Sequence, residues 1–242
     1  MSQNAVSNTL LYPAQVIGLA AIYVVSAKLS LALAIPPGYA TPIWPPAGIA
    51  LAALLFFGRR AWPGIWLGAA AVNYAVESSL VSAFTIGVGN SLEGVVAALL
   101  VERRQSDPRD FRRAEDVVSF IVICVIAASV AASVASVALA LNNSLPWALA
   151  FRNWWTWWQG DLAGMIIVAP LLLSWSIPSP SPWPAAKKLE AATFAVLLGG
   201  TAWAVTMNEA ARYAPFSLTF IALPPTNVIS YVPGTSTSRT PV

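Results

Sequence analysis

The stretch RNWWTWWQGDLAGMIIVAPLLLSW, residues 152–175, decides the fold class of this chain. Four tryptophans and a Gly-Asp-Leu-Ala-Gly segment precede a long apolar run. This order predicts a helix that enters a membrane through an aromatic belt and carries one carboxylate, Asp161, into the bilayer. An aspartate at the centre of a membrane helix costs about 2.5–3.5 kcal/mol on insertion scales, so it usually faces protein or water and marks a functional position.

The overall composition agrees with membrane insertion. Of the 242 residues 57% are hydrophobic and 10% are charged, whereas soluble domains carry about 25% charged residues. The opening MSQNAVSNTLLYPAQ has no basic segment ahead of a short apolar core, so we expect the first apolar segment to stay as a span and not to be removed as a signal peptide. The sequence therefore predicts an all-α, polytopic integral membrane protein whose first partner is the lipid bilayer.

Several classes of function are excluded by residue usage. The single cysteine, Cys124, rules out an intrachain disulfide, and the absence of histidine removes the commonest metal ligand. The pI near 9.2 does not indicate nucleic acid, because the basic residues lie between apolar runs and not on one soluble domain. No nucleophile with a base and no phosphate loop is present in the sequence. We expect no catalytic residue, no metal, no cofactor and no nucleic-acid partner.

The apolar runs predict about seven to eight transmembrane helices. Spans are expected over residues 14–35, over a short run after Ala47, and over residues 65–84, 85–101, 117–141, 152–175 and 189–207. An eighth run is broken by Pro224 and Pro225. The expected organisation is an N-terminal cytoplasmic segment, 1–13, a transmembrane domain, 14–223, and an irregular or disordered tail, 224–242.

The connections between these spans predict the orientation. Nine of the thirteen basic residues fall in the second, fourth and sixth connections, which places these on the cytoplasmic face by the positive-inside rule. The N-terminus is then cytoplasmic, and the proline-rich segment 36–48 lies at the outer interface. The tryptophans expected to form an aromatic belt at that interface are Trp44, Trp154, Trp155, Trp157 and Trp158. The alternative is an aromatic cage for a cation, with rings facing inward over Asp161.

Polar residues inside the spans form the candidate site. Glu93 and Asp161 each lie about nine residues into spans that run in the same direction, which puts both ~13 Å from the outer surface. The residues proposed to sense a ligand or a proton in this outer half are Lys28, Asn73, Glu77, Asn90, Glu93 and Asp161. Such a set can bind a small cation, an amine or a proton. The alternative is a buried pair of Lys28 with one acid that only fixes the helix arrangement.

Small residues at four-residue spacing predict where helices approach one another closely. GxxxG spacings begin at Gly64 and at Gly160. Such spacings also arise by chance in a chain rich in glycine and alanine, so by themselves they are weak indicators. In residues 117–141, the positions Ala128, Ala132 and Ser136 favour packing over chemistry.

Three stretches together resemble a known family. They are IWPPAGIALAALLFFGRRAWPGIWLGA at 43–69, GVGNSLEG at 87–94 and WWQGDLAGMIIVAPLLLSW at 157–175. In this order they resemble the bacterial membrane-associated sensor domain of the first type, the MASE group, over about residues 15–210. The family-like positions are Trp44, Pro45, Pro46, Gly48, Trp62, Pro63, Gly68, Asn73, Asn90, Glu93, Gly160, Asp161 and Pro170.

The resemblance implies a sensory domain of the bacterial inner membrane that precedes a histidine kinase, a diguanylate cyclase or a related output, as in two-component or cyclic-di-GMP signalling. It transfers no ligand. Signalling partners of this kind are usually dimers, so a homodimer is one expected assembly, which the sequence does not decide. After Phe220 the sequence shows no kinase, cyclase or phosphodiesterase motif. We therefore expect a truncated or frame-disrupted sensor or, as the alternative, one that acts through a separate cytoplasmic signalling partner.

Two further functions compete with the sensory one. The same intramembrane acids can serve a small cation- or proton-translocating transporter component, in which they form the ion pathway. The chain can also be a remnant that no longer signals. The sensory hypothesis requires that a ligand or a protonation state favours one helix packing over another.

Overall fold

The structure is a computed structural model that describes residues 3–32, 41, 43–105, 107–108, 111, 113–176, 184–190, 192–193 and 196. Throughout these residues the regular elements are helices and turns, without a strand, which confirms the all-α prediction. The chain divides into two units, Met1–Pro182 and Trp183–Val242. All of the named helices belong to the first unit, and residues 185–190 of the second are helical.

The described residues of the first unit form six α-helices: α1 (Gln3–Leu31), α2 (Pro45–Phe57), α3 (Trp62–Glu77), α4 (Leu80–Arg104), α5 (Ala114–Leu141) and α6 (Ala150–Trp175). The short 3-10 turns η1 (Arg59–Ala61) and η2 (Trp147–Leu149) lead into α3 and α6. Helices α2 and α3 begin with a proline in the first turn, where the missing N–H has no intrahelical partner to lose.

Four described segments are long and apolar enough to cross a membrane: Tyr12–Leu31, Leu80–Arg104, Ala114–Leu141 and Trp147–Trp175. Helix α2 has 13 residues and reaches only ~20 Å, which is short of the ~30 Å hydrocarbon core. The expected number of seven to eight spans is therefore not confirmed. Most of the span predicted over 189–207, and the whole of the eighth, lie outside the described residues.

The predicted boundary between the third and fourth spans is wrong. The third span was expected to run to Phe84, but α3 ends at Glu77 because Ser78 adopts the left-handed conformation (φ 54°). Ser79 then caps α4, its hydroxyl accepting a hydrogen bond from the Ser82 N–H at 3.3 Å. The first helix begins at Gln3, so most of the segment expected to precede the first span is helical.

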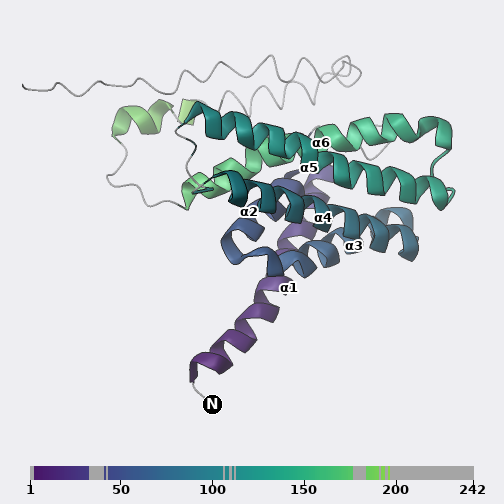
Figure 1. The fold of residues 1–242 in the computed structure, drawn as a ribbon, viewed down its shortest axis with the longest axis horizontal. Helices are drawn as coiled ribbons and strands as arrows, with labels where there is room; N and C mark the ends of the chain where they lie inside the picture. Colours follow the sequence, from purple (N-terminus) through teal and green to yellow (C-terminus); the bar gives the residue numbers. More distant parts are fainter. Residues whose placement is uncertain are drawn as a thin grey trace, which may run out of the picture. The chain divides into compact units, whose positions relative to one another are not determined.

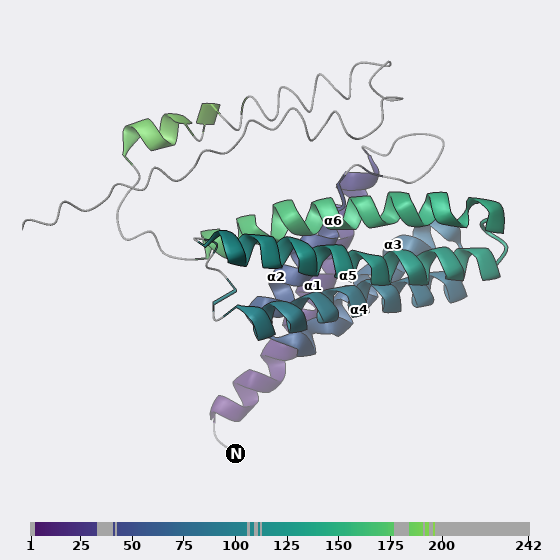
Figure 2. The same cartoon turned by 45° about the horizontal axis from the view of Figure 1, so that its top comes forward.

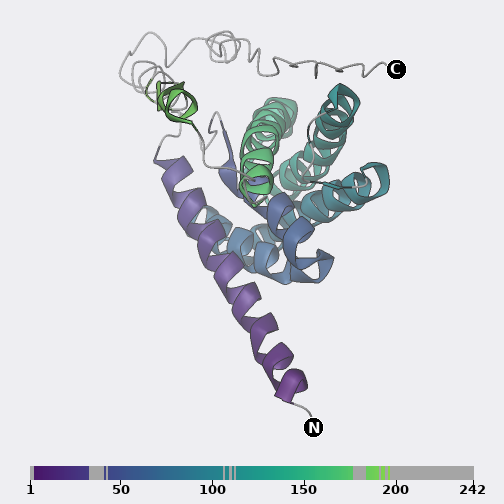
Figure 3. The same ribbon diagram turned by 90° about the vertical axis from the view of Figure 1, so that its left-hand side faces the viewer.

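Helices α3, α4, α5 and α6 run side by side, and α1 crosses them steeply (Figures 1 and 2). Figure 3 shows α1 lengthwise, whereas α4 to α6 are foreshortened. Helix α2 packs against α6, α4 and α1. An ion pair of 3.5 Å between Arg59 and Glu102 joins the ends of α2 and α4, and at the other end of α4 the Asn142 amide donates to the Ser79 hydroxyl at 3.0 Å.

Small residues bring these helices into close contact, as their spacing predicted. A Cβ atom on Gly164 of α6 would collide with the carbonyl group of Trp44, so α6 touches the start of α2 through its backbone. A Cβ atom on Gly68 of α3 would lie 2.7 Å from the Tyr23 Cβ of α1. The predicted packing positions Ala128, Ala132 and Ser136 of α5 are all buried, which confirms that this helix packs through its small side chains.

Candidate functional site

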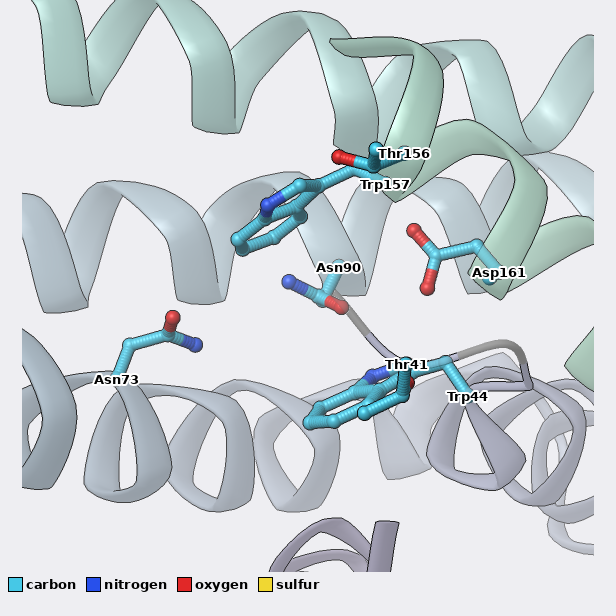
Figure 4. A pocket seen from close by; sticks show the side chains of 8 residues that line it. Thr41, Trp44, Asn73, Asn90, Thr156, Trp157 and Asp161 are labelled. Atoms are coloured by element: carbon cyan, nitrogen blue, oxygen red, sulfur yellow. The ribbon is translucent and has the colours of Figure 1, made fainter. Parts of the chain in front are cut away.

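A cavity of about 50 Å³ opens between α3, α4, α6 and the segment that precedes α2 (Figure 4). It is large enough for a few water molecules or a small ligand, and its wall has several polar groups that such an occupant needs as partners. The residues that line it are Thr41, Trp44, Asn73, Asn90, Thr156, Trp157, Gly160 and Asp161. The cavity therefore gathers side chains from four parts of the chain that are far apart in sequence.

A backbone contact holds the segment before α2 against α6. The Trp44 N–H donates to the Gly160 carbonyl at 2.9 Å, and the Thr41 carbonyl oxygen lies 3.1 Å from where a Cβ on Gly160 would stand. Because Gly160 has no side chain, Thr41 and Trp44 can approach α6 closely next to Asp161. In the Gly-Asp pair, Gly160 thus allows Thr41 and Trp44 to pack against α6, and Asp161 lines the cavity that they form.

Asp161 and Glu93 are both buried, with 3% and 2% of their surface exposed. Their carboxyl groups are close enough to interact electrostatically. Asp161 Oδ2 and Glu93 Oε1 are buried atoms with no hydrogen-bond partner among the described residues. A buried carboxylate without a compensating partner costs several kcal/mol, so a positive charge or a proton at this pair would be stabilising.

The two acids meet because α4 and α6 run in the same direction, each antiparallel to α5. Glu93 follows the start of α4 at Leu80 by 13 residues, and Asp161 follows the start of α6 at Ala150 by 11 residues. At ~1.5 Å per residue the difference is only ~3 Å along the helices. The structure therefore brings together the two acids that the sequence placed at one depth.

A chain of hydrogen bonds supports the wall below Asp161. The Tyr23 hydroxyl of α1 donates to Asn90 Oδ1 at 2.9 Å and accepts from Trp44 Nε1 at 3.5 Å. The Asn90 amide in turn donates to the Ile86 carbonyl at 2.9 Å. These bonds fix the orientation of Asn90 and Trp44, because each has a partner on a different helix or turn.

Of the six predicted sensing residues, Asn73, Asn90 and Asp161 line the cavity, and Glu93 lies beside Asp161. Glu77 ends α3, and its side chain lies outside the described set.

The expected place of Lys28 is wrong, because this side chain is exposed. The buried face of α1 carries Leu19, Tyr23 and Ala27 at four-residue spacing. Lys28 follows Ala27 directly and is turned about 100° away from that face. Among the described residues, Lys28 therefore forms no buried pair with Glu93 or Asp161.

The predicted belt tryptophans fall into two groups. Trp44 and Trp157 line the cavity and lie on either side of Asn90 in Figure 4, so these two side chains face inward. A cage over Asp161 stays a prediction. Trp158 stacks on Trp154, with ring centroids 6.0 Å apart, and on Trp155, with ring centroids 5.2 Å apart. A belt at a membrane interface stays a prediction.

Three residues of the site, Tyr23, Thr41 and Thr156, were missed by sequence reasoning. A tyrosine within an apolar span carried a usable signal, since its hydroxyl needs a partner when it is buried. The two threonines carried none, because a threonine in a helix or turn commonly bonds to its own backbone. Thr41 donates to the Ile43 carbonyl at 3.0 Å and Thr156 to the Asn153 carbonyl at 2.8 Å.

The fold and the site define a multi-pass membrane protein with a small polar cavity among its helices. The sequence profile of the MASE1 family, a membrane-associated sensor domain, matches residues 15–235. The chain belongs to this family, so it is a membrane domain with a sensory input role in signal transduction. Comparison with curated proteins and with solved structures gave no significant match.

Proposed function

We propose that this sensor domain detects a stimulus in the cavity beside Asp161. The observation that carries the proposal is the Asp161 carboxyl group, which is buried, faces the cavity and keeps one oxygen without a partner among the described residues. Ionisable groups inside a membrane domain are costly and mark functional positions. Binding at this atom removes that cost and so stabilises whichever helix packing holds the ligand best.

Helix α4 offers a direct route from the cavity to one end of the bundle. Glu93 and Asn90 lie in its middle, and Glu102 near its C-terminal end pairs with Arg59 beside α2. By the positive-inside rule this end, with Arg59, Arg60, Arg103 and Arg104, faces the cytoplasm. The proposed protein is thus a sensor of the bacterial inner membrane with a cytoplasmic N-terminus, which takes its stimulus in the cavity near the middle of α4.

The output belongs to the same proposal. We infer that movement of the cytoplasmic end of α4 is read by a histidine kinase, a diguanylate cyclase or a related signalling domain, in the same chain or in a separate partner. Signalling as a homodimer is part of this proposal.

A fusion experiment tests the sensory role. The chain is joined to a reporter histidine kinase, and its output is measured for the unchanged protein, for Asp161→Asn and for the control Glu115→Gln, an exposed residue in the first turn of α5. We expect Asp161→Asn to shift the basal output of the kinase or to abolish its response to changes in the medium, whereas Glu115→Gln leaves both unchanged. Equal output from Asp161→Asn and the unchanged protein in all conditions would remove the cavity from the mechanism.

The unpartnered acids also favour a second function, a cation- or proton-translocating component. Proteoliposomes that contain the chain test it through the flux of protons or monovalent cations. Flux that disappears in the double variant Asp161→Asn/Glu93→Gln would replace the sensory role by transport. Absence of flux from the unchanged protein, with a control transporter active in the same vesicles, would remove this alternative.

A further inference from the structure

We propose that the cavity binds the ammonium group of a small organic amine, with Asp161 as its counter-ion; this rests on the proposed function and names the ligand class of the same site. Three independent features of the wall point to this class: its charge, its hydrogen-bonding groups and its aromatic rings.

The charge of the site calls for a cation. Two carboxyl groups interact in the protein interior, and no ion pair reaches either of them from the described residues. Lys28, the basic residue that the sequence assigned to this site, is exposed. Arg59 pairs with Glu102 at the end of α4. An incoming ammonium group would supply the missing charge and a donor for Asp161 Oδ2.

The hydrogen-bonding groups of the wall are mostly left as acceptors. The Thr41 and Thr156 hydroxyl groups donate hydrogen bonds to backbone carbonyls. One N–H of the Asn73 amide donates to the Ala69 carbonyl at 2.9 Å. One N–H of the Asn90 amide likewise donates to the Ile86 carbonyl. Their oxygens still have free lone pairs, so acceptors outnumber the remaining donors, which are the indole of Trp157 and one N–H on each amide. A ligand that donates several hydrogen bonds fits such a wall, and a primary ammonium group has three N–H donors.

The aromatic rings distinguish an ammonium ligand from a strongly hydrated metal ion. Trp44 and Trp157 lie on opposite sides of the space into which the Asp161 carboxyl group points (Figure 4). Indole is the best ring for attracting a cation, and organic ammonium groups combine this attraction with apolar contact. A divalent ion such as Ca²⁺ needs about six to eight oxygen ligands. Among the described residues no three His, Cys, Asp or Glu side chains gather to hold a metal ion.

The size of the cavity limits the ligand. About 50 Å³ accommodates a group of a few heavy atoms, such as methylammonium or the head of a longer primary amine. A bulky quaternary ammonium needs more room than this wall provides. The proposal therefore predicts a preference for primary ammonium over tetramethylammonium.

Binding is tested on the full chain in detergent micelles by thermal unfolding with increasing methylammonium chloride, against sodium and potassium chloride at the same ionic strength. We expect methylammonium to raise the unfolding temperature and the inorganic salts to leave it unchanged. The matched control Glu102→Gln keeps the response. Asp161→Asn weakens the apparent affinity by more than about tenfold, since it removes the counter-ion. Trp157→Phe keeps an aromatic ring, but a phenyl ring attracts a cation less strongly than an indole ring. We expect this variant to weaken the apparent affinity for methylammonium by about two- to fivefold.

Several results would overturn the ligand class. One is an equal response to methylammonium and sodium, and another is an unchanged affinity in Asp161→Asn. A third is stabilisation by acid alone, without any effect of methylammonium, which would assign a proton to the acid pair. If Asp161→Asn does not fold, unchanged affinity in both Trp157→Phe and Glu93→Gln has the same meaning.

The reporter fusion separates this inference from the proposed function. Amine binding that depends on Asp161, without any change of output, would keep the ligand class and reject the sensory role of the cavity. Output that changes in Asp161→Asn, without amine binding to the unchanged chain, would keep the sensory role and reject the ligand class.

Discussion

Two glutamates on α4, Glu93 in its middle and Glu102 near its end, experience opposite surroundings. Glu93 is 2% exposed, lies near Asp161 and has a carboxyl oxygen without a partner. The Glu102 side chain is 38% exposed and pairs with Arg59 at 3.5 Å. An exposed pair costs little and contributes little, whereas a buried unpaired acid lowers stability. The Glu93 carboxyl group in the middle of α4 therefore lowers the stability of the fold, whereas the Glu102 carboxyl group at its end does not.

The largest expected effect comes from the backbone contact that forms the cavity. Gly164→Ala places a Cβ atom against the Trp44 carbonyl, so we expect it to lower the free energy of unfolding by about 3 kcal/mol or more. Gly18→Ala on α1, where a Cβ meets nothing within 4 Å, is the control and should not lower stability. Denaturant-induced unfolding in detergent measures both. Similar stability of the two variants would mean that α6 and Trp44 are not in contact.

The two glutamates themselves are compared by replacement with leucine. Glu93→Leu removes a buried carboxyl group without a partner and should raise the free energy of unfolding by about 2 kcal/mol while abolishing the reporter response. Glu102→Leu should change stability by no more than about 0.5 kcal/mol. A loss of stability in Glu93→Leu would show that its carboxyl group is satisfied in the folded protein and would end the contrast.

Two tyrosines on α1 give a similar pair. Tyr23 is buried and bonds to Asn90 and Trp44, whereas Tyr12 is exposed and donates to the Arg60 carbonyl at 3.0 Å. Tyr23→Phe should lower the free energy of unfolding by about 1–2 kcal/mol, because it leaves buried partners unbonded. Tyr12→Phe should stay within about 0.5 kcal/mol. Equal losses of unfolding free energy in the two variants would show that the Tyr23 hydroxyl is no more buried than the Tyr12 hydroxyl.

The smallest expected effect is the coupling between Arg59 and Glu102. Both side chains are more than a third exposed, so water and salt screen their interaction. A double-mutant cycle with alanine at each position should give a coupling of about 0.5 kcal/mol that declines with added salt. A coupling that salt leaves unchanged would show that this end of α4 is shielded from water and would weaken the comparison with Glu93.

The sequence predicted helices well where long apolar runs are bounded by charge or proline, as for α5 and α6. It misplaced the junction of α3 and α4, because the turn at Ser78 and Ser79 has neither glycine nor proline to mark it. It also assigned Lys28 to the site. Depth along a helix was readable from residue counting, but the face on which Lys28 lies depends on how α1 packs against its neighbours.

By itself the sequence determined the membrane class, the two acids at one depth and the family, since these depend on composition, spacing and local motifs. Only the tertiary structure decided which groups share the cavity, because the contacts that build it join distant segments. Trp44 meets Gly160 through the backbone, and Tyr23 reaches Asn90 across two helices. The opening stretch of α6 thus contributes Trp157 and Asp161 to a wall that Trp44 completes. The physical reason is that close approach depends on the shapes of both partners, which neither segment specifies alone.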